Sequence, residues 1–444
     1  MAPITGSVER TADGLIVWHA HTGAALGPVA FDAHNLGLGV DAADPRCVLT
    51  VVADASDRDS GATYFTDPGF LTALVDATTG ATLPQPQLVD EIARAATIHA
   101  VSRFHLGDLE PGIVTLDEAH AAALCGDMDG ARGRYLMATS SMEEVLTDLA
   151  ENGGGESIAE ELEVAVAQCP AMDPENAIAT VAAAIVDGQD ARWSEMVLSI
   201  HQEELATTFS PPSPTGAGDF LDLSLLPPRL MRFTGPDEHD LTLRMIGDDT
   251  VEASAVVRDA IYTSSSEAAG LFVIAVERAT GELVSSAPCE ARGMRMVARL
   301  WLAEHELDDL HFLMVTLDVP LDEVSARPLD VRLARVDRAC RHAWTNHRRG
   351  RAILALVNSA TAPELVDAAG HAIAHCRQQA DDWAANARIA LEDILLHYQS
   401  SNDQKLVADF REGVLRLQEL VGGDIAPDSP LRPTLAELHA ETGW

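Results

Sequence analysis

The chain has 444 residues, of which 47 % are apolar and 22 % are charged, as expected of a folded protein with two or three domains. Its 69 acidic and 30 basic residues give a formal net charge of −39, which repels nucleic acid and anionic membranes at long range. Lys405 is the only lysine, so the chain has no phosphate-binding loop of the G-x-x-x-x-G-K type.

No apolar run reaches the roughly 18 residues that a membrane helix needs, and no basic region followed by an apolar stretch opens the sequence. We therefore expect neither a membrane span nor a signal peptide. The six cysteines are widely spaced and form no C-x-x-C pair: Cys47, Cys125, Cys169, Cys289, Cys340 and Cys376. This spacing favours reduced thiols and predicts a cytoplasmic protein.

In chain order, the first half is predicted to contain two hairpins, an amphipathic helix, two further strands and C-terminal helices. The elements are a hairpin of 35–40 with 47–55, a hairpin beginning at 70–77 and turning at Thr79-Gly80, a helix over 88–104, a strand ending at Asp117, a strand near 134–138 and helices over 156–208.

The second half is predicted to repeat this order. Its elements are a hairpin of 240–245 with 251–257, a hairpin beginning at 271–277 and turning at Thr280-Gly281, a helix over 290–305, a strand ending at Asp318, a strand near 351–356 and helices over 362–421.

An internal match supports the repetition. Residues 69–117 align without a gap onto residues 270–318, with 12 of 49 positions identical, against roughly three or four expected by chance. The sequence therefore predicts an α+β protein with two tandem copies of one unit, each a mixed β-sheet flanked by helices. The copies would span 1–208 and 219–444, joined by a Pro/Ser/Gly-rich linker at 209–218.

The predicted order of strands and helices resembles that of the ribonuclease H-like fold, and its duplication is similar to that of the actin-like ATPases. The acidic residue that ribonuclease H-like nucleases carry in the first helix would fall near Arg94 and Arg295, and the Gly-rich phosphate loops of the actin-like ATPases are missing. The resemblance therefore implies a topology and no activity.

Three aspartates of the first half are candidate metal ligands. Asp54 and Asp57 follow a predicted strand and Asp117 ends another, so neighbouring strand ends could bring their carboxylates together. Such a site would bind Mg²⁺ and hold a phosphodiester for hydrolysis. The alternative is that Asp117 caps a helix N-terminus.

The most unusual local feature is basic. Eight of the 30 basic residues lie within 25 positions, opposed only by Asp330 and Asp337: Arg327, Arg332, Arg335, Arg338, Arg341, Arg348, Arg349 and Arg351. Their spacing predicts a helix that packs its apolar residues inward while the guanidinium groups project outward. The residues expected to dock a partner are Arg332, Arg335, Arg338, Arg341 and Arg348; alternatively, these arginines neutralise acidic surface of the same molecule or of a second copy.

These features predict a non-catalytic interaction or assembly protein that docks an acidic partner, or a second copy of itself, through the arginine-rich helix. The net charge disfavours nucleic acid as the partner. The alternative is a metal-dependent phosphoester hydrolase with Asp54, Asp57 and Asp117 as ligands. A third hypothesis is a small-molecule-binding protein with its pocket between the halves.

The charge imbalance yields a prediction about stability. Because 69 acids face 30 bases, raising the salt concentration from low to physiological should increase the melting temperature by screening repulsion. A melting temperature that stays flat or falls across this range, followed by circular dichroism, would show that the acids are already paired.

Overall fold

The computed structural model describes residues 4–54, 62–135, 218–257, 266–316, 328–357, 363–397, 401–423 and 429–442, with short gaps inside the first four ranges. The chain divides into two compact units. The first unit comprises residues 1–209, 339–388 and 405–444, and the second comprises 210–338 and 389–404. Residues 339–388 and 405–444, which the sequence analysis assigned to the second half, therefore belong with the N-terminal part. Of the proposed linker, only Gly218 is described.

The first unit contains a six-stranded antiparallel sheet with the order β3-β4-β5-β2-β1-β6. Its strands are β1 (Thr5–Arg10), β2 (Ile16–Ala20), β3 (Pro28–Ala33), β4 (Leu36–Asp41), β5 (Val48–Ala53) and β6 (Thr82–Pro84). The pairing of β4 with β5 confirms the hairpin predicted over 35–40 and 47–55. Strands β1, β2 and β3 were not predicted.

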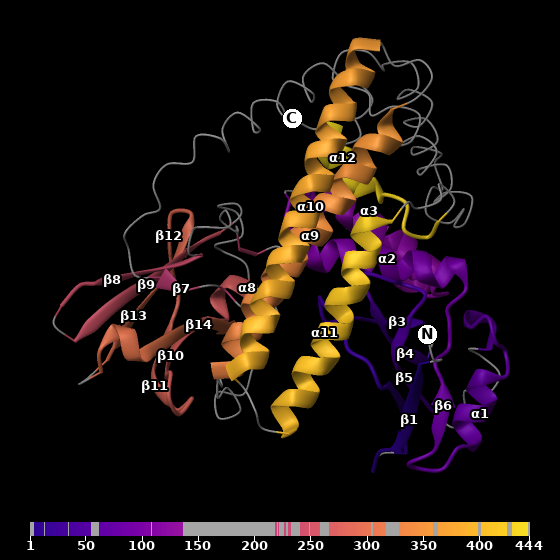
Figure 1. Cartoon of the computed structure of the whole chain (residues 1–444), viewed down its shortest axis with the longest axis horizontal. Coiled ribbons are helices and arrows are strands. Elements are labelled where there is room, and N and C mark those ends of the chain that lie inside the picture. The colour runs from indigo at the N-terminus through magenta and orange to yellow at the C-terminus, as the bar shows by residue number, and fades with distance from the viewer. Residues whose placement is uncertain are drawn as a thin grey trace. The chain divides into compact units, whose positions relative to one another are not determined.

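Helices of the first unit are α1 (Phe70–Asp76), α2 (Asp90–Phe104), α3 (Pro111–Leu124), α12 (Leu435–Thr442) and a short 3₁₀ turn at Ala62–Tyr64. Helix α2 confirms the predicted helix over 88–104 and packs against both α3 and β3. Three long helices also contribute to the unit: α9 (Pro328–Leu356), α10 (Pro363–His397) and α11 (Ser401–Gly422). Their segments within this unit run side by side (Figure 1).

Two segments of the first half were predicted as strands and are helices. Residues 70–77 form α1 because Asp67 accepts the Gly69 amide at 2.9 Å in a turn, after which apolar residues recur with helical spacing. The strand expected to end at Asp117 lies inside α3 instead. Glu110 caps that helix by accepting the Ile113 amide at 2.7 Å, and Pro111 occupies its first turn.

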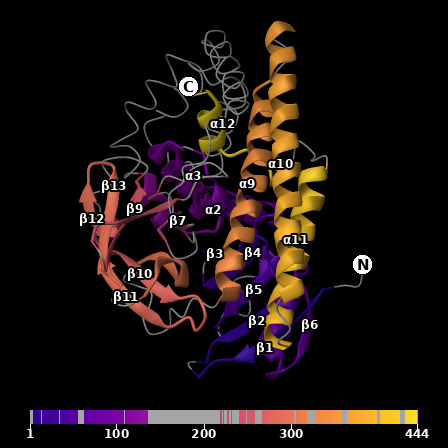
Figure 2. The same ribbon diagram turned by 60° about the vertical axis from the view of Figure 1, so that its left-hand side comes forward.

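The second unit consists of a five-stranded and a three-stranded antiparallel sheet, with the orders β12-β13-β9-β8-β7 and β11-β10-β14 (Figure 2). The strands are β7 (Gly218–Asp219), β8 (Leu241–Met245), β9 (Thr250–Val256), β10 (Leu271–Glu277), β11 (Leu283–Pro288), β12 (Glu290–Arg292), β13 (Arg295–Trp301) and β14 (Leu310–Thr316). A short helix α8 (Ser266–Ala269) precedes β10, and a 3₁₀ turn at Leu307–Asp309 precedes β14. The hairpin of β8 and β9 and the strand β10 were predicted.

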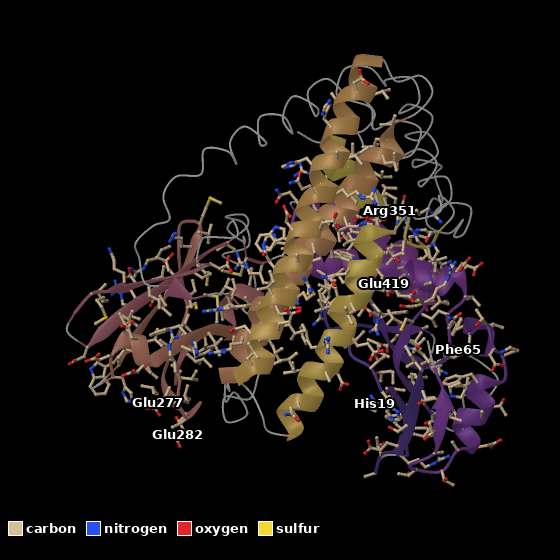
Figure 3. The ribbon with its side chains drawn as sticks, viewed as in Figure 1. His19, Phe65, Glu277, Glu282, Arg351 and Glu419 are labelled. Carbon is tan, nitrogen blue, oxygen red and sulfur yellow. The ribbon has the colours of Figure 1, made fainter. Side chains whose placement is uncertain are left out.

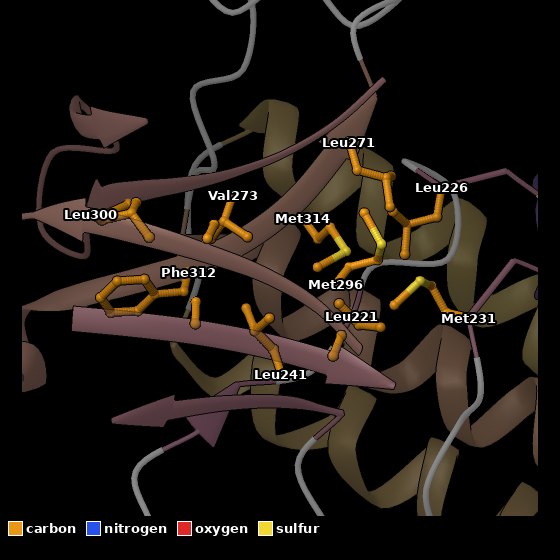
Figure 4. Close-up of a cluster of buried hydrophobic side chains, with 14 of the residues drawn as sticks. Leu221, Leu226, Met231, Leu241, Leu271, Val273, Met296, Leu300, Phe312 and Met314 are labelled. Carbon is orange, nitrogen blue, oxygen red and sulfur yellow. The ribbon is translucent and has the colours of Figure 1, made fainter. Parts of the chain in front are cut away.

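Both sheets contribute to one hydrophobic core (Figure 4). Leu241 and Leu300 point into it from the larger sheet, and Val273 and Phe312 from the smaller one. The other face of the smaller sheet is buried as well, through residues such as Ile274 and Val315. Strands β10 and β14 are thus buried on both faces, which explains their nearly continuous apolar sequences, whereas β11 at the edge is more exposed.

The prediction of a helix over 290–305 is wrong, because this segment forms the hairpin of β12 and β13. Arg292 pairs with Arg295 across a two-residue turn in which Gly293 has a φ of 61°, a conformation that favours glycine. Met296, Ala298 and Leu300 then point into the core from one face of the strand; on the other face Arg295, Arg299 and Trp301 are exposed and Val297 is covered.

The aligned segments 69–117 and 270–318 therefore form different structures, and the prediction that they repeat one order of strands and helices is wrong. The first segment contains α1, β6, α2 and α3, whereas the described part of the second contains strands β10 to β14 and a 3₁₀ turn. The matched Thr-Gly pairs do keep a common feature, since Gly80 and Gly281 both have positive φ. The shared sequence thus preserves a turn but not a topology, and the resemblance to the ribonuclease H-like order is not found.

Within the described ranges, no helix is both long and apolar enough to cross a bilayer. The five cysteines in the same ranges are all free, and Cys169 lies outside them. Burial raises the pKa of the thiols of Cys47, Cys125 and Cys289 to about 12, so these three thiols remain protonated near neutral pH.

Helix α11 approaches the loop between β2 and β3 closely. A Cβ atom at Gly413 would lie 2.4 Å from the backbone nitrogen of Ala25, so only glycine fits there without movement. One turn further along, Arg416 donates to Asp41 and to the hydroxyl of Thr22, each at 2.9 Å. The contact is therefore held by close backbone packing and by a buried ion pair.

Substitution at this contact should separate packing from helix propensity. Gly413→Ala should destabilise the protein by about 1–3 kcal/mol, because overpacking against backbone outweighs the better helix propensity of alanine. The matched change Gly370→Ala on α10, where a Cβ meets nothing within 4 Å, should stabilise it by about 0.5–1 kcal/mol. Urea unfolding measures both; a stabilising Gly413→Ala would show that α11 can move away from the loop.

Candidate functional site

Helix α9 carries the arginine-rich segment, and its apolar side lies in the interior as predicted. The buried residues of that side are Leu333, Val336, Cys340 and Trp344. The Trp344 indole nitrogen donates to the carbonyl of Ala42 at 3.3 Å, and the amide of Leu106 donates to the Thr345 hydroxyl at 3.1 Å. Helix α9 is thus anchored to the N-terminal part of the first unit.

The guanidinium groups do not form the outward stripe that the spacing predicts. Arg338, Arg341 and Arg348 are only 6 %, 3 % and 1 % exposed, and the prediction of outward projection is wrong for these three. Arg335 is exposed and Arg332 is half-buried. Partner binding by Arg332 and Arg335 stays a prediction.

Two of the buried arginines, Arg338 and Arg341, lie near the middle of α9, and each contacts a side chain from another element. In the second unit, Arg338 forms an ion pair with Asp240, whose carboxylate also accepts the Leu221 amide at 3.4 Å. Burial lowers the pKa of Arg338 to about 10. In the first unit, the Arg341 guanidinium lies 4.7 Å from the ring centroid of Phe104, a cation–π contact.

Arg348 forms the most deeply buried ion pair among the described residues of the first unit. Its Nε and Nη2 donate to the two carboxylate oxygens of Glu437 at 2.7 and 2.5 Å, and each side chain is only 1 % exposed. The remaining donors of the guanidinium reach the carbonyls of Leu431 and Arg432. The bidentate geometry and the carbonyl contacts supply the hydrogen bonds that a buried ion pair requires.

Residues 430–437 are held by charged side chains from three helices. Arg94 of α2 donates to the carbonyls of Pro430, Arg432 and Pro433. Asp117 of α3 accepts the amides of Leu435 and Ala436, at 3.3 and 2.8 Å. Together with Arg348 of α9, these residues provide hydrogen-bond partners for the backbone carbonyls of the extended segment and for the free backbone amides at the N-terminus of α12.

The start of α12 also contains a capping box. The Thr434 amide donates to the Glu437 carboxylate at 2.8 Å, and the Glu437 amide donates to the Thr434 hydroxyl at 3.4 Å. Burial alone would raise the pKa of Glu437, but Arg348 lowers it to about 2. Because this pKa is depressed, Glu437 stabilises the fold fully above pH 4.5, and its contribution is lost as the pH falls towards 2.

The three candidate metal ligands do not form a site in the described part of the chain. Both oxygens of Asp117 accept backbone amides of α12, so this aspartate caps a helix, although a different one from the helix that follows it in sequence. Asp54 is exposed after β5, and Asp57 lies outside the described residues. No group of three or more His, Cys, Asp or Glu side chains placed to hold an ion occurs within the described ranges. The structure therefore gives no support to the Mg²⁺ hypothesis.

A second set of arginines lies on the surface of the second unit. The outer face of the five-stranded sheet carries Arg244 on β8, Arg292 on β12 and both Arg295 and Arg299 on β13; these four residues and Trp301 are called the arginine face below. The strand register places Trp301 beside Thr250 and Arg299 beside Glu252, which point to the same side of the sheet. Trp301 is 65 % exposed.

Glu252 lies at the centre of the arginine face. Arg244, Arg299 and Arg292 approach its carboxylate at 2.6, 3.3 and 3.4 Å, while Arg295 donates to the Ser254 hydroxyl at 3.1 Å. Partial burial would raise the pKa of Glu252, but the hydrogen bonds from Arg244 and Arg299 hold it below its ordinary value. Three guanidinium groups thus share one carboxylate and keep donors available for further carboxylate or phosphate oxygens.

Sequence reasoning missed the arginine face because its members are far apart in the chain. Arg295 and Arg299 are four residues apart, a spacing that also fits one face of a helix, and the segment was interpreted in that way. The alternation of Met296, Ala298 and Leu300 with these arginines was the available strand signal. Arg244 joins them only through the pairing of β8 with β9 and of β9 with β13.

Comparison with protein-family models, with curated proteins and with solved structures finds no match for the chain. Functional inference therefore depends on the two arginine sets alone. The buried set stabilises the C-terminal segment, and the arginine face is open to solvent.

The Arg348–Glu437 pair leads to a test of charge burial. Glu437→Gln should cost about 3–5 kcal/mol, because it leaves the Arg348 charge buried without its anion while glutamine still permits the capping box. Glu419→Gln on α11, an exposed position labelled in Figure 3, should change stability by less than about 0.5 kcal/mol. Denaturant unfolding compares the two; a loss below about 1 kcal/mol for Glu437→Gln would contradict the structural role of the pair.

Proposed function

We propose that the protein is an interaction or assembly protein that docks an acidic protein surface on the arginine face. The observation that carries the proposal is the clustering of four exposed arginines and an exposed tryptophan on one sheet face, in a chain whose net charge is −39. This revises the predicted docking site, which was the arginine-rich helix.

The chemistry of the face favours carboxylates as the groups recognised. A guanidinium group binds a carboxylate bidentately, and Arg and Trp are the residues most enriched at energetic centres of protein interfaces. Glu252 already occupies the centre of the face as a carboxylate ligand of three arginines. A partner carboxylate would extend this existing network.

A nucleic acid is the less favoured polyanion. The face carries Arg244, Arg292, Arg295 and Arg299 against Glu252 and Glu290, a local excess of two positive charges. A nucleic acid would bring a charge every few ångströms towards a chain of net charge −39. A protein surface can place a few carboxylates opposite the arginines and neutral groups elsewhere.

The test compares charge reversal on the face with charge reversal elsewhere. Arg295→Glu and, separately, Trp301→Ala should each weaken binding of the partner at least tenfold, because both side chains are exposed on the face and belong to the residue types that most often dominate binding energy. Arg411→Glu, an exposed arginine on α11, makes the same change in net charge and should leave binding unchanged.

The measurement is quantitative affinity capture from the native host, followed by titration of the captured protein, with sedimentation to detect a second copy as partner. Support requires a partner of acidic surface whose binding depends on Arg295 and Trp301 and weakens with salt. The same captured proteins for both variants and the control, or binding of nucleic acid only, would overturn the proposal.

A further inference from the structure

Two neighbouring residues of α9 carry buried nitrogen atoms that lack hydrogen-bond partners. His347 and Arg351 are four residues apart and therefore lie on the same side of the helix. The unpaired atoms are Nε2 of His347 and Nη1 of Arg351. Both residues are partly exposed although these two nitrogens are buried, so a small rotation of the side-chain ends would open the nitrogens to a ligand from solvent. Figure 3 labels Arg351.

The surroundings of Arg351 are cationic. Arg348, the next arginine along this side of α9, and Arg94 of α2 both interact with it electrostatically. Among the described residues, the anion that acts on Arg351 is Glu437, and its oxygens are already bound by Arg348 and by the Thr434 amide. Arg348 and Arg351 therefore depend on one carboxylate, and Arg348 already uses its capacity for a bidentate contact.

The same surroundings act on the two unpaired groups. Burial and the neighbouring Arg348 lower the pKa of Arg351 to about 10, so it still carries its charge at neutral pH. Burial, Arg348 and Arg351 lower the pKa of His347 to about 3, so its imidazole is neutral and offers one N–H donor. A half-buried charge whose nearby anion is already bound by another arginine is costly, and a second anion would relieve the cost.

We propose that His347 and Arg351 form a binding site for a small oxyanion, a phosphate or a carboxylate. Arg351 would donate through Nη1, and the neutral His347 through Nε2–H in the tautomer that carries the proton there. The neighbouring Arg94 and Arg348 strengthen the attraction without losing their own partners. Metal cations are disfavoured by the same field. The site lies in the first unit and is independent of the arginine face.

Thermal unfolding in matched ionic strength tests the site. Phosphate, replacing chloride, should raise the melting temperature of the full chain by about 2–5 °C for each tenfold increase above its dissociation constant. Succinate in a parallel series distinguishes a carboxylate from a phosphate ligand. Arg351→Met should abolish the response, while Arg411→Met on α11, an exposed arginine, should retain it.

The ligand-free state supplies a second readout. In chloride, Arg351→Met should not lower the melting temperature, because no hydrogen bond or ion pair is lost and a buried charge is removed. His347→Ala should weaken the phosphate response while leaving Arg351 to supply part of it. The proposal is overturned if wild type responds equally to all three anions, or if Arg351→Met lowers the melting temperature in chloride by as much as it does in phosphate, which would indicate a partner within the chain.

Discussion

The ion pair between Arg348 and Glu437 is the interaction on which the C-terminal part of the first unit depends. It joins the middle of α9 to the first turn of α12, although 89 residues separate the two in sequence. The same guanidinium reaches the carbonyls of Leu431 and Arg432, and Arg94 approaches Arg432 from α2. One charged contact thus organises a segment that has no ladder or helix of its own to satisfy its backbone.

Arginine suits this role because its planar group offers five donors and stays charged when buried. The carbonyl oxygens of the segment 430–434 lose their hydrogen bonds to water on burial. Arg94 and Arg348 provide donors that replace those bonds. Asp117 does the complementary task by accepting the amides of α12. Each buried arginine is costly to desolvate unless it finds acceptors, and in the observed placement of the C-terminal segment Arg94 and Arg348 both find them.

Sequence patterns predicted the elements in which local signals agree. Helix α2, the β4–β5 and β8–β9 hairpins and strand β10 all combine periodic apolar residues with suitable ends. Patterns failed where one sequence serves two structures: Val-Thr-Leu-Asp lies within α3 at Val114–Asp117, while Val315 and Thr316 end β14. Glu110 and Pro111 start a helix before the first copy, and pairing with β10 holds the second in a sheet. These capping residues and this partner strand lie within the aligned segments, but Glu110 and Pro111 are replaced by His311 and Phe312 in the second segment.

The candidate site was harder to predict than the fold because charge in a sequence does not reveal depth. Arg338, Arg341 and Arg348 belong to the densest run of arginines in the sequence, yet they are buried. A helix that packs on several sides leaves few positions at which a polar side chain reaches solvent. The dispersed arginines, Arg244, Arg292, Arg295 and Arg299, meet at the surface through strand pairing alone. A sheet gathers residues from distant parts of a chain onto one face, whereas a helix gathers only its own neighbours. A high density of arginines along the sequence therefore indicates only that one helix is rich in arginine. The exposed cluster of arginines depends instead on the register in which the strands pair.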